Sequence, residues 1–350
     1  MDKISEQLLH LREINDETVK NLTGPYFVSW DVTNRCNFKC LHCLNRSGDS
    51  DYYKAFSDEL TEDEAMNLCD QIIEVNPFSV CICGGEPLLR KDIFKILKKL
   101  SSNIYQVNMV SNGYLIDEEK AEMISQSGIT MLQISLDSDG ENFHDAFRGH
   151  EGAFSHALRA IKIMKEKHIQ QLAVAFCPTT LNIDQFDNFV DIMVENGVKS
   201  IRMMPLLPLG RGYDNYVKLK PSDDQYLDLI YKIKKKEEQY KNEALSIEWG
   251  DPLEHIALPV FENRNIALSL EVRSNGDIGP SIYMPISVGN IRKHTLKEYW
   301  DNGFNFIWKR PEVLEMAKKY ITISDFKDVK LKAWTDERKY IDIIEEKKED

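Results

Sequence analysis

Long apolar segments and positive charge are both scarce in this sequence. No uninterrupted apolar run approaches the roughly 18 residues of a membrane-spanning helix, and the charged N-terminal stretch MDKISEQLLHLREIND lacks the apolar centre of a signal peptide. Lysine and arginine together number 44, against 57 aspartate and glutamate residues, for a net charge of −13. We therefore expect a cytoplasmic protein without a membrane partner, and binding to nucleic-acid backbones is disfavoured.

Cysteine is absent beyond Cys177. The chain has seven cysteines, and three of them fall within eight residues. A chain of 350 residues with 42% hydrophobic content can bury a large core, so folding needs no disulfide or metal. This pattern indicates a reducing cytosol and not a secreted, disulfide-linked protein. The seven are Cys36, Cys40, Cys43, Cys69, Cys81, Cys83 and Cys177.

Between residues 27 and 208 the chain alternates short β-rich runs with amphipathic helical stretches. This alternation predicts repeated βα units that build a parallel sheet with helices packed against it. Six such strands indicate an α/β fold of the partial-barrel type, a (βα)6 barrel. The expected strands are Phe27 to Thr33, Ser79 to Cys83, Gln106 to Ser111, Met131 to Asp137, Leu172 to Cys177 and Ser200 to Leu206.

Caps and apolar spacing predict the helices of this region. Thr61 to Glu64 has the sequence of a capping box, and apolar residues follow it at the spacing of a buried helix face. We expect Cys69 on that face to be a small core residue, and Trp30 and Met203 to lie in the core. Further helices are predicted near 117 to 126, 153 to 167 and 185 to 196.

The pattern changes after residue 212, where a helix near 222 to 242 is rich in lysine and glutamate. Farther on, Leu268 to Val272, a turn at Asn275 and Gly276, and a run from Ile278 predict a β-hairpin, and a helix begins at Leu296. We therefore divide the chain into four parts. They are an N-terminal helical extension (1–25), the barrel (26–212), a helical connector (213–262) and a small α+β appendage with a charged tail (263–350).

Cys36, Cys40 and Cys43 form a CxxxCxxC segment directly after the first predicted strand. Catalytic loops of βα barrels leave the sheet at this carboxyl edge. A four-iron cluster held by three protein thiolates has one iron open to a small chelating ligand, whereas structural or electron-carrying clusters normally take four cysteines. The alternative is a zinc site, which His42 or a distant histidine would complete.

A glycine-rich segment, GGEP at residues 84–87, ends the second predicted strand. A zinc knuckle does not require such a strand end, so its position favours the cluster. The cysteine segment, GGEP, Ser111-Asn112-Gly113 and Ile134-Ser135-Leu136-Asp137 together resemble the radical S-adenosylmethionine (radical SAM) superfamily in order and spacing. The resemblance covers roughly residues 26 to 212, and it implies a 4Fe-4S cluster and S-adenosylmethionine (SAM) as cofactors.

The resemblance also implies roles for individual residues. Three thiols would ligate the cluster, a glycine-rich strand end would let backbone atoms approach the methionine part of SAM, and polar side chains would hold its ribose and carboxylate. By position, the ligands are Cys36, Cys40 and Cys43; the strand receiving the amino group is Gly84, Gly85, Glu86 and Pro87; the ribose contacts are Ser111 and Asn112; the carboxylate contacts are Ser135 and Arg148; and the neighbour of the adenine is Phe38.

The same resemblance implies the reaction. An electron, delivered by a carrier such as flavodoxin or ferredoxin, would cleave SAM to methionine and a 5′-deoxyadenosyl radical, which abstracts hydrogen from an unactivated carbon. The cofactor supplies this chemistry. The protein holds the target hydrogen in place and excludes water and competing donors.

The second half resembles a degenerate SPASM or twitch module, on the segments Gly276-Asp277-Ile278 and Gly289-Asn290-Ile291 and on a helix that contains Trp300. Where that module carries a cysteine after its hairpin glycine, this sequence has Ser281, and no cysteine follows. An auxiliary cluster is therefore not expected, since serine and histidine are poor substitutes in that role. Redox-neutral outcomes become favoured.

A redox-neutral outcome such as epimerisation needs a second hydrogen donor, typically a thiol or a tyrosine. Cys83 and Cys177 are candidates, because both could face the barrel interior, although each also fits as a small buried side chain in a strand. Asp137 is a third catalytic candidate. Further polar candidates, which could instead cap a helix, shape a loop or form salt bridges, are Glu141, His144, Asp145, Asn182, Asp184, Arg202 and Arg211.

Three functions are consistent with these observations. The first is modification of a peptide by epimerisation or crosslinking, because the most similar radical SAM enzymes with such a tail mature ribosomal peptides. The roughly 25 residues ahead of the first strand are too few for a separate leader-peptide domain, which weakens this interpretation. The second is rearrangement, dehydrogenation or epimerisation of a small sugar or cyclitol. The third, from another class, is a noncatalytic zinc-binding scaffold.

Overall fold

A computed structural model describes residues 22–49, 58–167, 169–250, 253–261, 266–319, 321 and 339–346. Residues 1–21 of the predicted N-terminal extension and the last four residues of the charged tail lie outside the described residues. Among the helices that are described, none is both long and apolar enough to cross a membrane.

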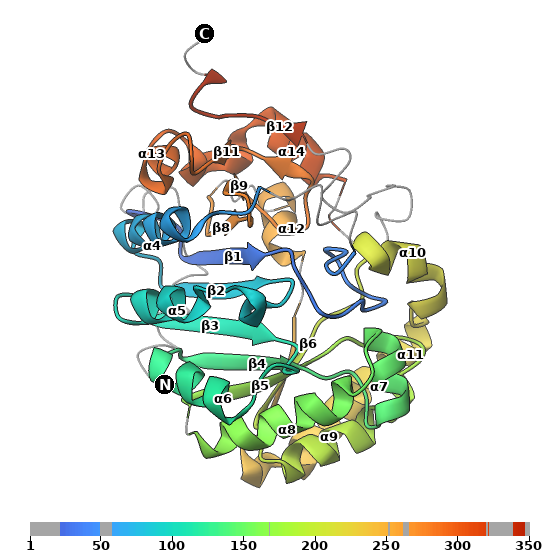
Figure 1. The fold of residues 1–350 in the computed structure, drawn as a ribbon. Coiled ribbons are helices and arrows are strands. Elements are labelled where there is room, and N and C mark those ends of the chain that lie inside the picture. The colour runs from blue at the N-terminus through green and yellow to red at the C-terminus, as the bar shows by residue number, and fades with distance from the viewer. Residues whose placement is uncertain are drawn as a thin grey trace.

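One sheet of ten strands organises the molecule, in the order β11-β9-β8-β1-β2-β3-β4-β5-β6-β7. The strands from β8 to β7 in this order run parallel, and helices follow β2 to β6 along the chain, which is the architecture of a partial α/β barrel. Figure 1 shows the helices outside the strands. The strands are β1 (Phe27–Thr33), β2 (Ser79–Gly84), β3 (Gln106–Ser111), β4 (Met131–Ser135), β5 (Gln171–Phe176), β6 (Ser200–Met203), β7 (Ser246–Trp249), β8 (Ser269–Val272), β9 (Asp277–Gly279) and β11 (Gly289–Asn290), with β10 (Ile286–Ser287) and β12 (Lys339–Tyr340) in a second sheet.

The predicted partial α/β barrel is confirmed, and all six predicted strands are present as β1 to β6. β7 pairs with β6 and β8 pairs with β1, so the second half of the chain adds a parallel strand to each side of the predicted set. Two predicted strands also end early, because the chain leaves the sheet after residue 135 in β4 and after residue 203 in β6.

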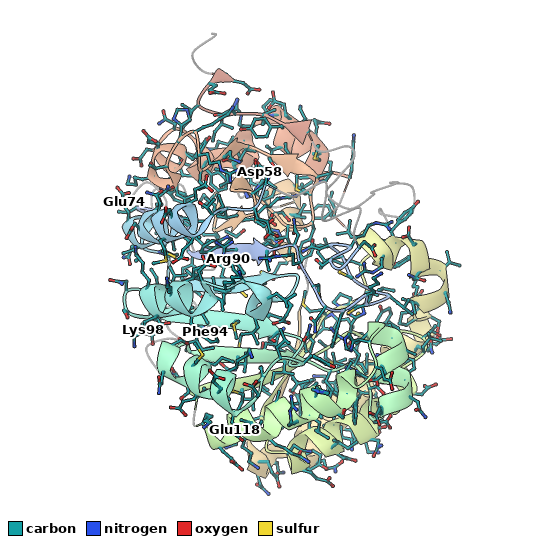
Figure 2. All side chains as sticks on the ribbon, in the orientation of Figure 1. Asp58, Glu74, Arg90, Phe94, Lys98 and Glu118 are labelled. Carbon is teal, nitrogen blue, oxygen red and sulfur yellow. The ribbon has the colours of Figure 1, made fainter. Side chains whose placement is uncertain are left out.

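The helices begin and end within a few residues of the predicted positions. Thr61 caps α4 in a capping box with Glu64, and Cys69 on that helix is fully buried, as expected. In Figure 2, Glu74, Lys98 and Glu118 point outward from the helix layer. The helices are α4 (Glu62–Val75), α5 (Ile93–Ser101), α6 (Glu118–Ser127), α7 (Glu141–Arg148), α8 (Ala153–Glu166), α9 (Phe186–Glu195), α10 (Gly210–Leu219), α11 (Asp223–Gln239), α12 (Glu254–Phe261), α13 (Leu296–Asp301) and α14 (Pro311–Ala317), with 3-10 segments at Pro87–Leu89, Ile183–Gln185, Lys241–Glu243 and Phe304–Lys309.

The two faces of the sheet differ in polarity. Residues such as Val28, Trp30 and Ile82 are fully buried in the apolar core between sheet and helices, and Met203 joins them as predicted. Side chains on the other face are small or polar, since successive residues of a strand alternate in direction. On that face Ser29 of β1 pairs with Cys81 of β2, and Asp31 pairs with Cys83. Farther along the sheet, Ser135 pairs with Ala175, Ala175 with Arg202, and Arg202 with Glu248. The barrel interior is therefore polar and not packed with large apolar groups.

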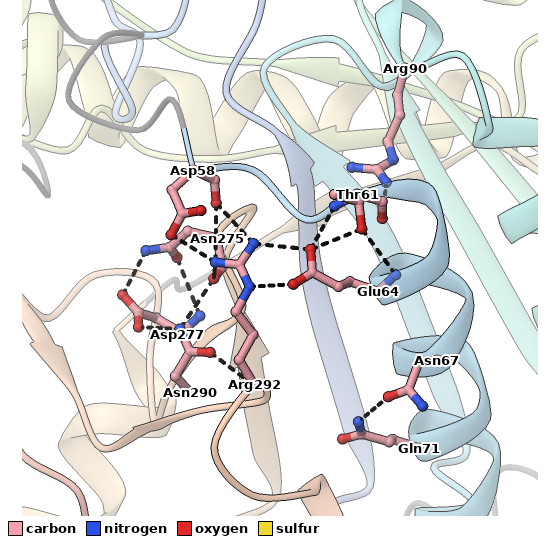
Figure 3. A network of polar contacts seen from close by, with 10 residues as sticks. All are labelled: Asp58, Thr61, Glu64, Asn67, Gln71, Arg90, Asn275, Asp277, Asn290 and Arg292. Carbon is pink, nitrogen blue, oxygen red and sulfur yellow. Dashed lines mark hydrogen bonds and ion pairs between the residues drawn. The ribbon is translucent and has the colours of Figure 1, made fainter.

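The C-terminal elements lie beside β1 (Figure 1). The predicted hairpin is confirmed as β8 and β9, which pair antiparallel, and Gly276 in its turn has a φ of 85° that favours glycine. Figure 3 shows Arg292 between this turn and the start of α4, where its guanidinium donates to Glu64 at 2.6 and 3.0 Å and to Asp58 at 2.7 Å. The division of the chain near residue 213 remains a prediction.

Candidate active site

A cavity of about 260 Å³ lies at the carboxyl ends of β1 to β4. The three thiols of Cys36, Cys40 and Cys43 line it, and none of them forms a disulfide. In Figure 1 the loop that carries them leaves the end of β1 and passes beside α10. Of the predicted site residues, those that line the cavity are Cys36, Phe38, Cys40, Cys43, Cys83, Gly84, Gly85, Ser111, Asn112, Ser135 and Arg148; those outside its lining are Glu86, Pro87, Asp137 and Cys177.

Burial dominates the electrostatics of the thiols. It raises the pKa of Cys36 to about 12 and that of Cys40 to about 11, although the nearby charge of Arg148 lowers the latter. Burial also lowers the pKa of His42 to about 4, and its ring stacks on Phe147 with centroids 4.5 Å apart. Among the described residues, no group of three His, Cys, Asp or Glu side chains converges on a single metal ion.

Backbone contacts hold the cysteine loop on two sides. The N–H groups of Lys39 and Leu41 donate to the carbonyls of Arg148 and Phe147 at 3.2 and 2.9 Å. On the other side, Arg211 of α10 donates from Nε to the carbonyl of Cys40 at 2.9 Å and from Nη2 to a second loop carbonyl at 2.6 Å. The sequence left Arg211 open between an anionic substrate group and a salt bridge, and the structure shows the salt bridge, with Nη1 of Arg211 3.0 Å from Asp49 Oδ2.

The start of α10 approaches this loop closely. A Cβ atom at Gly210 would lie 2.4 Å from the carbonyl oxygen of Leu44, and the φ of Gly210 is +57°, a conformation that favours glycine. The next backbone N–H, that of Arg211, donates to the carbonyl of Cys43 at 2.9 Å. Only a residue without a side chain fits here, so α10 fixes the far end of the cysteine segment.

We expect Arg211→Ala to loosen the cysteine loop, because two hydrogen bonds from a charged group to loop carbonyls disappear, at a cost of about 2 kcal/mol in unfolding free energy. The rate of iron release from reconstituted protein to a chelator should rise. Arg211→Lys should restore the rate only in part, because an ammonium cannot reproduce the guanidinium fork. Equal release rates in Arg211→Ala and the unaltered protein would contradict this role.

Gly84 and Gly85 allow the backbone of residues 33–35, which leads into the cysteine loop, to pass close to them. Gly84 has a φ of +125°, and a Cβ atom there would lie 2.4 Å from the carbonyl oxygen of Thr33. A Cβ atom at Gly85 would lie 2.1 Å from the carbonyl oxygen of Arg35. The prediction gave these glycines the task of admitting SAM. Both do line the cavity, but the close approach that the structure requires is to residues 33–35.

Glu86 is fully buried, and the protein itself uses both of its carboxylate oxygens. Ser111 Oγ donates to Oε1 at 2.9 Å, the N–H of Asn112 donates to Oε2 at 2.8 Å, and the N–H of Leu88 donates to Oε1 at 3.2 Å. Asn112 in turn donates from Nδ2 to Asn37 Oδ1 at 2.8 Å. Glu86 therefore ties the ends of β2 and β3 together, and Asn112 extends that tie to the cysteine loop.

The pH dependence of stability should report on Glu86. Burial raises its pKa to about 7, against 4.5 for the free side chain. As pH rises between these values, the unfolded chain loses this proton first, so the stabilisation that is fully present below pH 4.5 is lost as pH passes through about 7. The loss amounts to about 3 kcal/mol in unfolding free energy relative to Glu86→Gln, measured by urea titration across this range. Glu74→Gln, at an exposed position, should follow the unaltered protein, and parallel curves for Glu86→Gln would refute the assignment.

Asp137 does not present a free carboxylate. It is fully buried and forms an ion pair with Arg148, whose Nη2 and Nε lie 2.5 and 2.7 Å from Oδ2. Its Oδ1 accepts from the N–H of Cys177 at 2.8 Å. Burial acts to raise the pKa of Asp137, but Arg148, His42, His144 and the N–H of Cys177 together outweigh it and hold the pKa below its ordinary value. Arg148 also donates from Nη1 to Cys40 Sγ at 3.8 Å, so the pair reaches the cysteine loop.

Phe38 has the surroundings of an aromatic wall. Only 1% of its surface is exposed, and its ring centroid lies 4.7 Å from that of His150 and 5.7 Å from that of Tyr114. Tyr114 stacks on His156 at 4.1 Å. The sequence pointed to Phe38 alone, whereas residues from three segments build this side of the cavity.

The other polar candidates lie away from the cavity lining. Glu141, His144 and Asp145 were expected in a loop but belong to α7, where the buried His144 accepts at Nδ1 from the N–H of Asp137 at 3.2 Å. Asn182 donates to the carbonyl of Asp137 at 2.8 Å. These residues, with Asp184 in the following 3-10 segment, shape the loops, which was the alternative that the sequence left open. Arg202 pairs across strands with Glu248 at 3.4 Å.

The two candidate hydrogen donors separate in space. Cys83 lines the cavity, and its Sγ lies 3.3 Å from both Asp31 Oδ1 and Ser29 Oγ. Cys177 lies outside the lining and packs against the apolar cluster around Phe147 and Leu206. Sequence reasoning missed three polar residues that do line the cavity, because none belongs to a recognisable motif: Asp31, Asn45 and Ser47.

A parallel α/β barrel with free thiols and polar strand ends around one cavity at its carboxyl edge has the layout of an enzyme active site. A family model described as the radical SAM superfamily matches residues 30–193. Over these residues the chain matches the radical SAM superfamily, so the resemblance found in the sequence is confirmed there, and the chain is an enzyme. The family implies a 4Fe-4S cluster and SAM.

Two curated relatives align with different shares of this chain. The chain is 26% identical over 299 residues to the AdoMet-dependent heme synthase of Methanosarcina barkeri, with 80% of this chain and 83% of that protein covered. It is 30% identical over 210 residues to the mycofactocin maturase MftC of Mycolicibacterium smegmatis, with 60% and 52% covered. The chain thus spans about half the length of that maturase.

Among solved structures, Streptococcus suis SuiB bound to its precursor peptide SuiA aligns with a TM-score of 0.66 at 16% identity, over 96% of this chain and 81% of that chain. SuiB bound to S-adenosylmethionine aligns with a TM-score of 0.63 at 18% identity, over 87% and 73%. At this identity the likeness shows the fold.

Proposed function

We propose that this radical SAM enzyme modifies a peptide, by epimerisation or crosslinking, with a single 4Fe-4S cluster. The observation that carries the proposal is the cavity at the barrel edge, where the three thiols lie beside a wall of small and polar side chains. The relatedness to a peptide maturase and the likeness to SuiB support a peptide substrate. The absence of cysteine beyond Cys177 supports a single cluster.

The residues present fit the cofactors that the family implies. The three thiols share one cavity without converging on a single ion, which suits a multi-iron cluster better than zinc. The raised pKa values of Cys36 and Cys40 mean that binding a metal must displace the protons of these two thiols. Gly84 and Gly85 line the cavity without side chains, which leaves backbone open for a ligand.

In this proposal the cluster and SAM supply hydrogen-atom abstraction from an unactivated carbon, and the chain supplies position. Cys36, Cys40 and Cys43 would hold the cluster, and the guanidinium of Arg148, which Asp137 fixes beside Cys40, would bind the carboxylate of SAM with Ser135. Phe38, backed by Tyr114 and His150, would bind the adenine. Glu86 sets the spacing of the strand ends, and the interior wall excludes water around the substrate.

A tetrapyrrole is a second candidate substrate, because the heme synthase relative matches a greater length of the chain than the maturase does. The likeness to SuiB bound to its precursor peptide favours the peptide, and Asp31, Asn45 and Ser47 contribute polar groups to the cavity wall. No observation favours the sugar or cyclitol alternative, and membership of an enzyme superfamily removes the main support for a noncatalytic scaffold.

The test begins with anaerobic reconstitution, which should give about four irons per chain and reductive cleavage of SAM to 5′-deoxyadenosine. Candidate peptides are those encoded beside the gene. Product formed in deuterated water should carry deuterium at an α carbon after epimerisation but not after crosslinking. A Fe-porphyrin offered in parallel tests the second candidate, and turnover of the porphyrin alone would overturn the peptide proposal.

A further inference from the structure

We propose that Cys83 is the hydrogen-atom donor that quenches the substrate radical, with Asp31 as its proton partner. This inference rests on the proposed function, and it selects a redox-neutral outcome such as epimerisation. Its starting point is the position of the thiol. Cys83 is the only cysteine outside the CxxxCxxC segment that lines the cavity of the described chain, so its S–H faces the space in which the substrate reacts.

The surroundings of Cys83 keep a hydrogen on its sulfur. Its thiol donates to Asp31 Oδ1 at 3.3 Å and lies 3.3 Å from Ser29 Oγ. A hydrogen bond with Cys81, burial and the neighbouring Asp31 all act to raise its pKa well above the ordinary value. A thiolate would suit nucleophilic chemistry, whereas this thiol stays protonated and can give up a hydrogen atom.

Unpaired polar atoms beside Cys83 indicate that a ligand binds here. Asn45 donates from Nδ2 to Asp31 Oδ2 at 3.2 Å, which fixes the carboxylate, but its Oδ1 has no hydrogen-bond partner among the described residues. Ser47 Oγ likewise has none in the described chain. These residues are 7% and 2% exposed, and both line the same cavity as Cys83. Buried polar atoms of this kind are costly unless a ligand satisfies them. An acceptor and a hydroxyl together suit an amide group of a peptide.

The step balances as follows. The S–H bond of Cys83 breaks and a C–H bond forms on the substrate, which leaves a thiyl radical on Cys83. One electron from a carrier of the flavodoxin or ferredoxin class and one proton from water, relayed through Asp31, restore the thiol. The S–H bond is similar in strength to the C–H bond at a peptide α carbon, so the transfer needs no large input of energy. An O–H bond is stronger than that C–H bond, so serine cannot replace Cys83 in this role.

The experiment needs no identified substrate. Reconstituted protein with SAM and dithionite in deuterated water, where thiols exchange to S–D, should release 5′-deoxyadenosine one mass unit heavier, because the empty cavity leaves Cys83 as the nearest weak bond. Cys83→Ser retains a hydroxyl that can donate to Asp31, and it should lose most of this label. It should bind SAM as tightly as the unaltered protein in equilibrium dialysis. A cysteine with only a structural role would tolerate serine with the label intact.

Cys69→Ser is the control, because Cys69 is buried on α4 and lies outside the cavity lining, and its label should persist. Equal labelling in Cys83→Ser and the unaltered protein, or loss of label in Cys69→Ser alone, would overturn the inference. Absence of 5′-deoxyadenosine from the unaltered protein would instead mean that the proposed function fails. The two failures are therefore distinguishable.

Discussion

Cys40→Ala is expected to abolish SAM cleavage while leaving the chain folded. Cys40 has the central position among the proposed ligands: it is 8% exposed, and Arg148 lies 3.8 Å from its sulfur. A cluster held by three protein thiolates keeps only two when Cys40 is lost, and the CxxxCxxC segment offers no replacement. We expect the iron content to fall from about four per chain to near zero after anaerobic reconstitution, and 5′-deoxyadenosine to fall below detection.

Cys69→Ala is the matched control for this truncation. Cys69 is a fully buried cysteine on α4 and does not line the cavity. Its replacement removes one buried sulfur and should lower stability by about 1 kcal/mol, with iron content and cleavage unchanged. Circular dichroism of both variants separates loss of the cluster from loss of the fold. Full iron content in folded Cys40→Ala would refute the ligand assignment, and the zinc alternative would regain support if zinc replaced iron in the unaltered protein.

Local pattern carried much of the fold. β1 and β3 match their predicted bounds, because alternating apolar residues and the following breakers are properties of short segments. The capping box at Thr61 and the hairpin turn at Gly276 could also be predicted from the sequence, since each depends on neighbouring residues. The motifs that line the cavity were found for the same reason: each lies at the end of one strand.

Long-range contacts were beyond such reasoning. No local sequence pattern indicates that β8 pairs with β1, because the two strands are more than 200 residues apart and parallel pairing leaves no turn between them. The hydrogen bond from Arg211 to the carbonyl of Cys40 joins residues 171 positions apart, and no sequence motif indicates it. Asp137 was expected to be catalytic because a carboxylate follows a strand end, but its partner Arg148 lies on another element, and only the structure shows the pairing.

The buried ion pair of Asp137 and Arg148 is expected to contribute strongly to stability. Asp137→Asn should lower the free energy of unfolding by about 3 to 5 kcal/mol, because it leaves the guanidinium of Arg148 buried without a counter-ion. Both partners are well buried, with side chains 1% and 9% exposed. Urea unfolding of the two proteins should give equal slopes and different midpoints. The double variant Asp137→Asn with Arg148→Met should recover part of the loss, since it removes the stranded charge.

The exposed cross-strand ion pair of Arg202 and Glu248 is the reference with which the loss of unfolding free energy in Asp137→Asn is compared. Its side chains are 41% and 53% exposed, so Glu248→Gln should cost only about 0 to 1 kcal/mol. An equally small cost for Asp137→Asn would mean that water reaches Arg148 and that the pair does not hold the cavity wall. A large cost makes Asp137 a positioning residue, because a carboxylate bound at 2.5 Å to an arginine and at 2.8 Å to a backbone N–H has no proton-transfer role to spare. Asp137 then acts on the reaction only through Arg148, and among the three catalytic candidates from the sequence it is Cys83 whose side chain reaches the cavity.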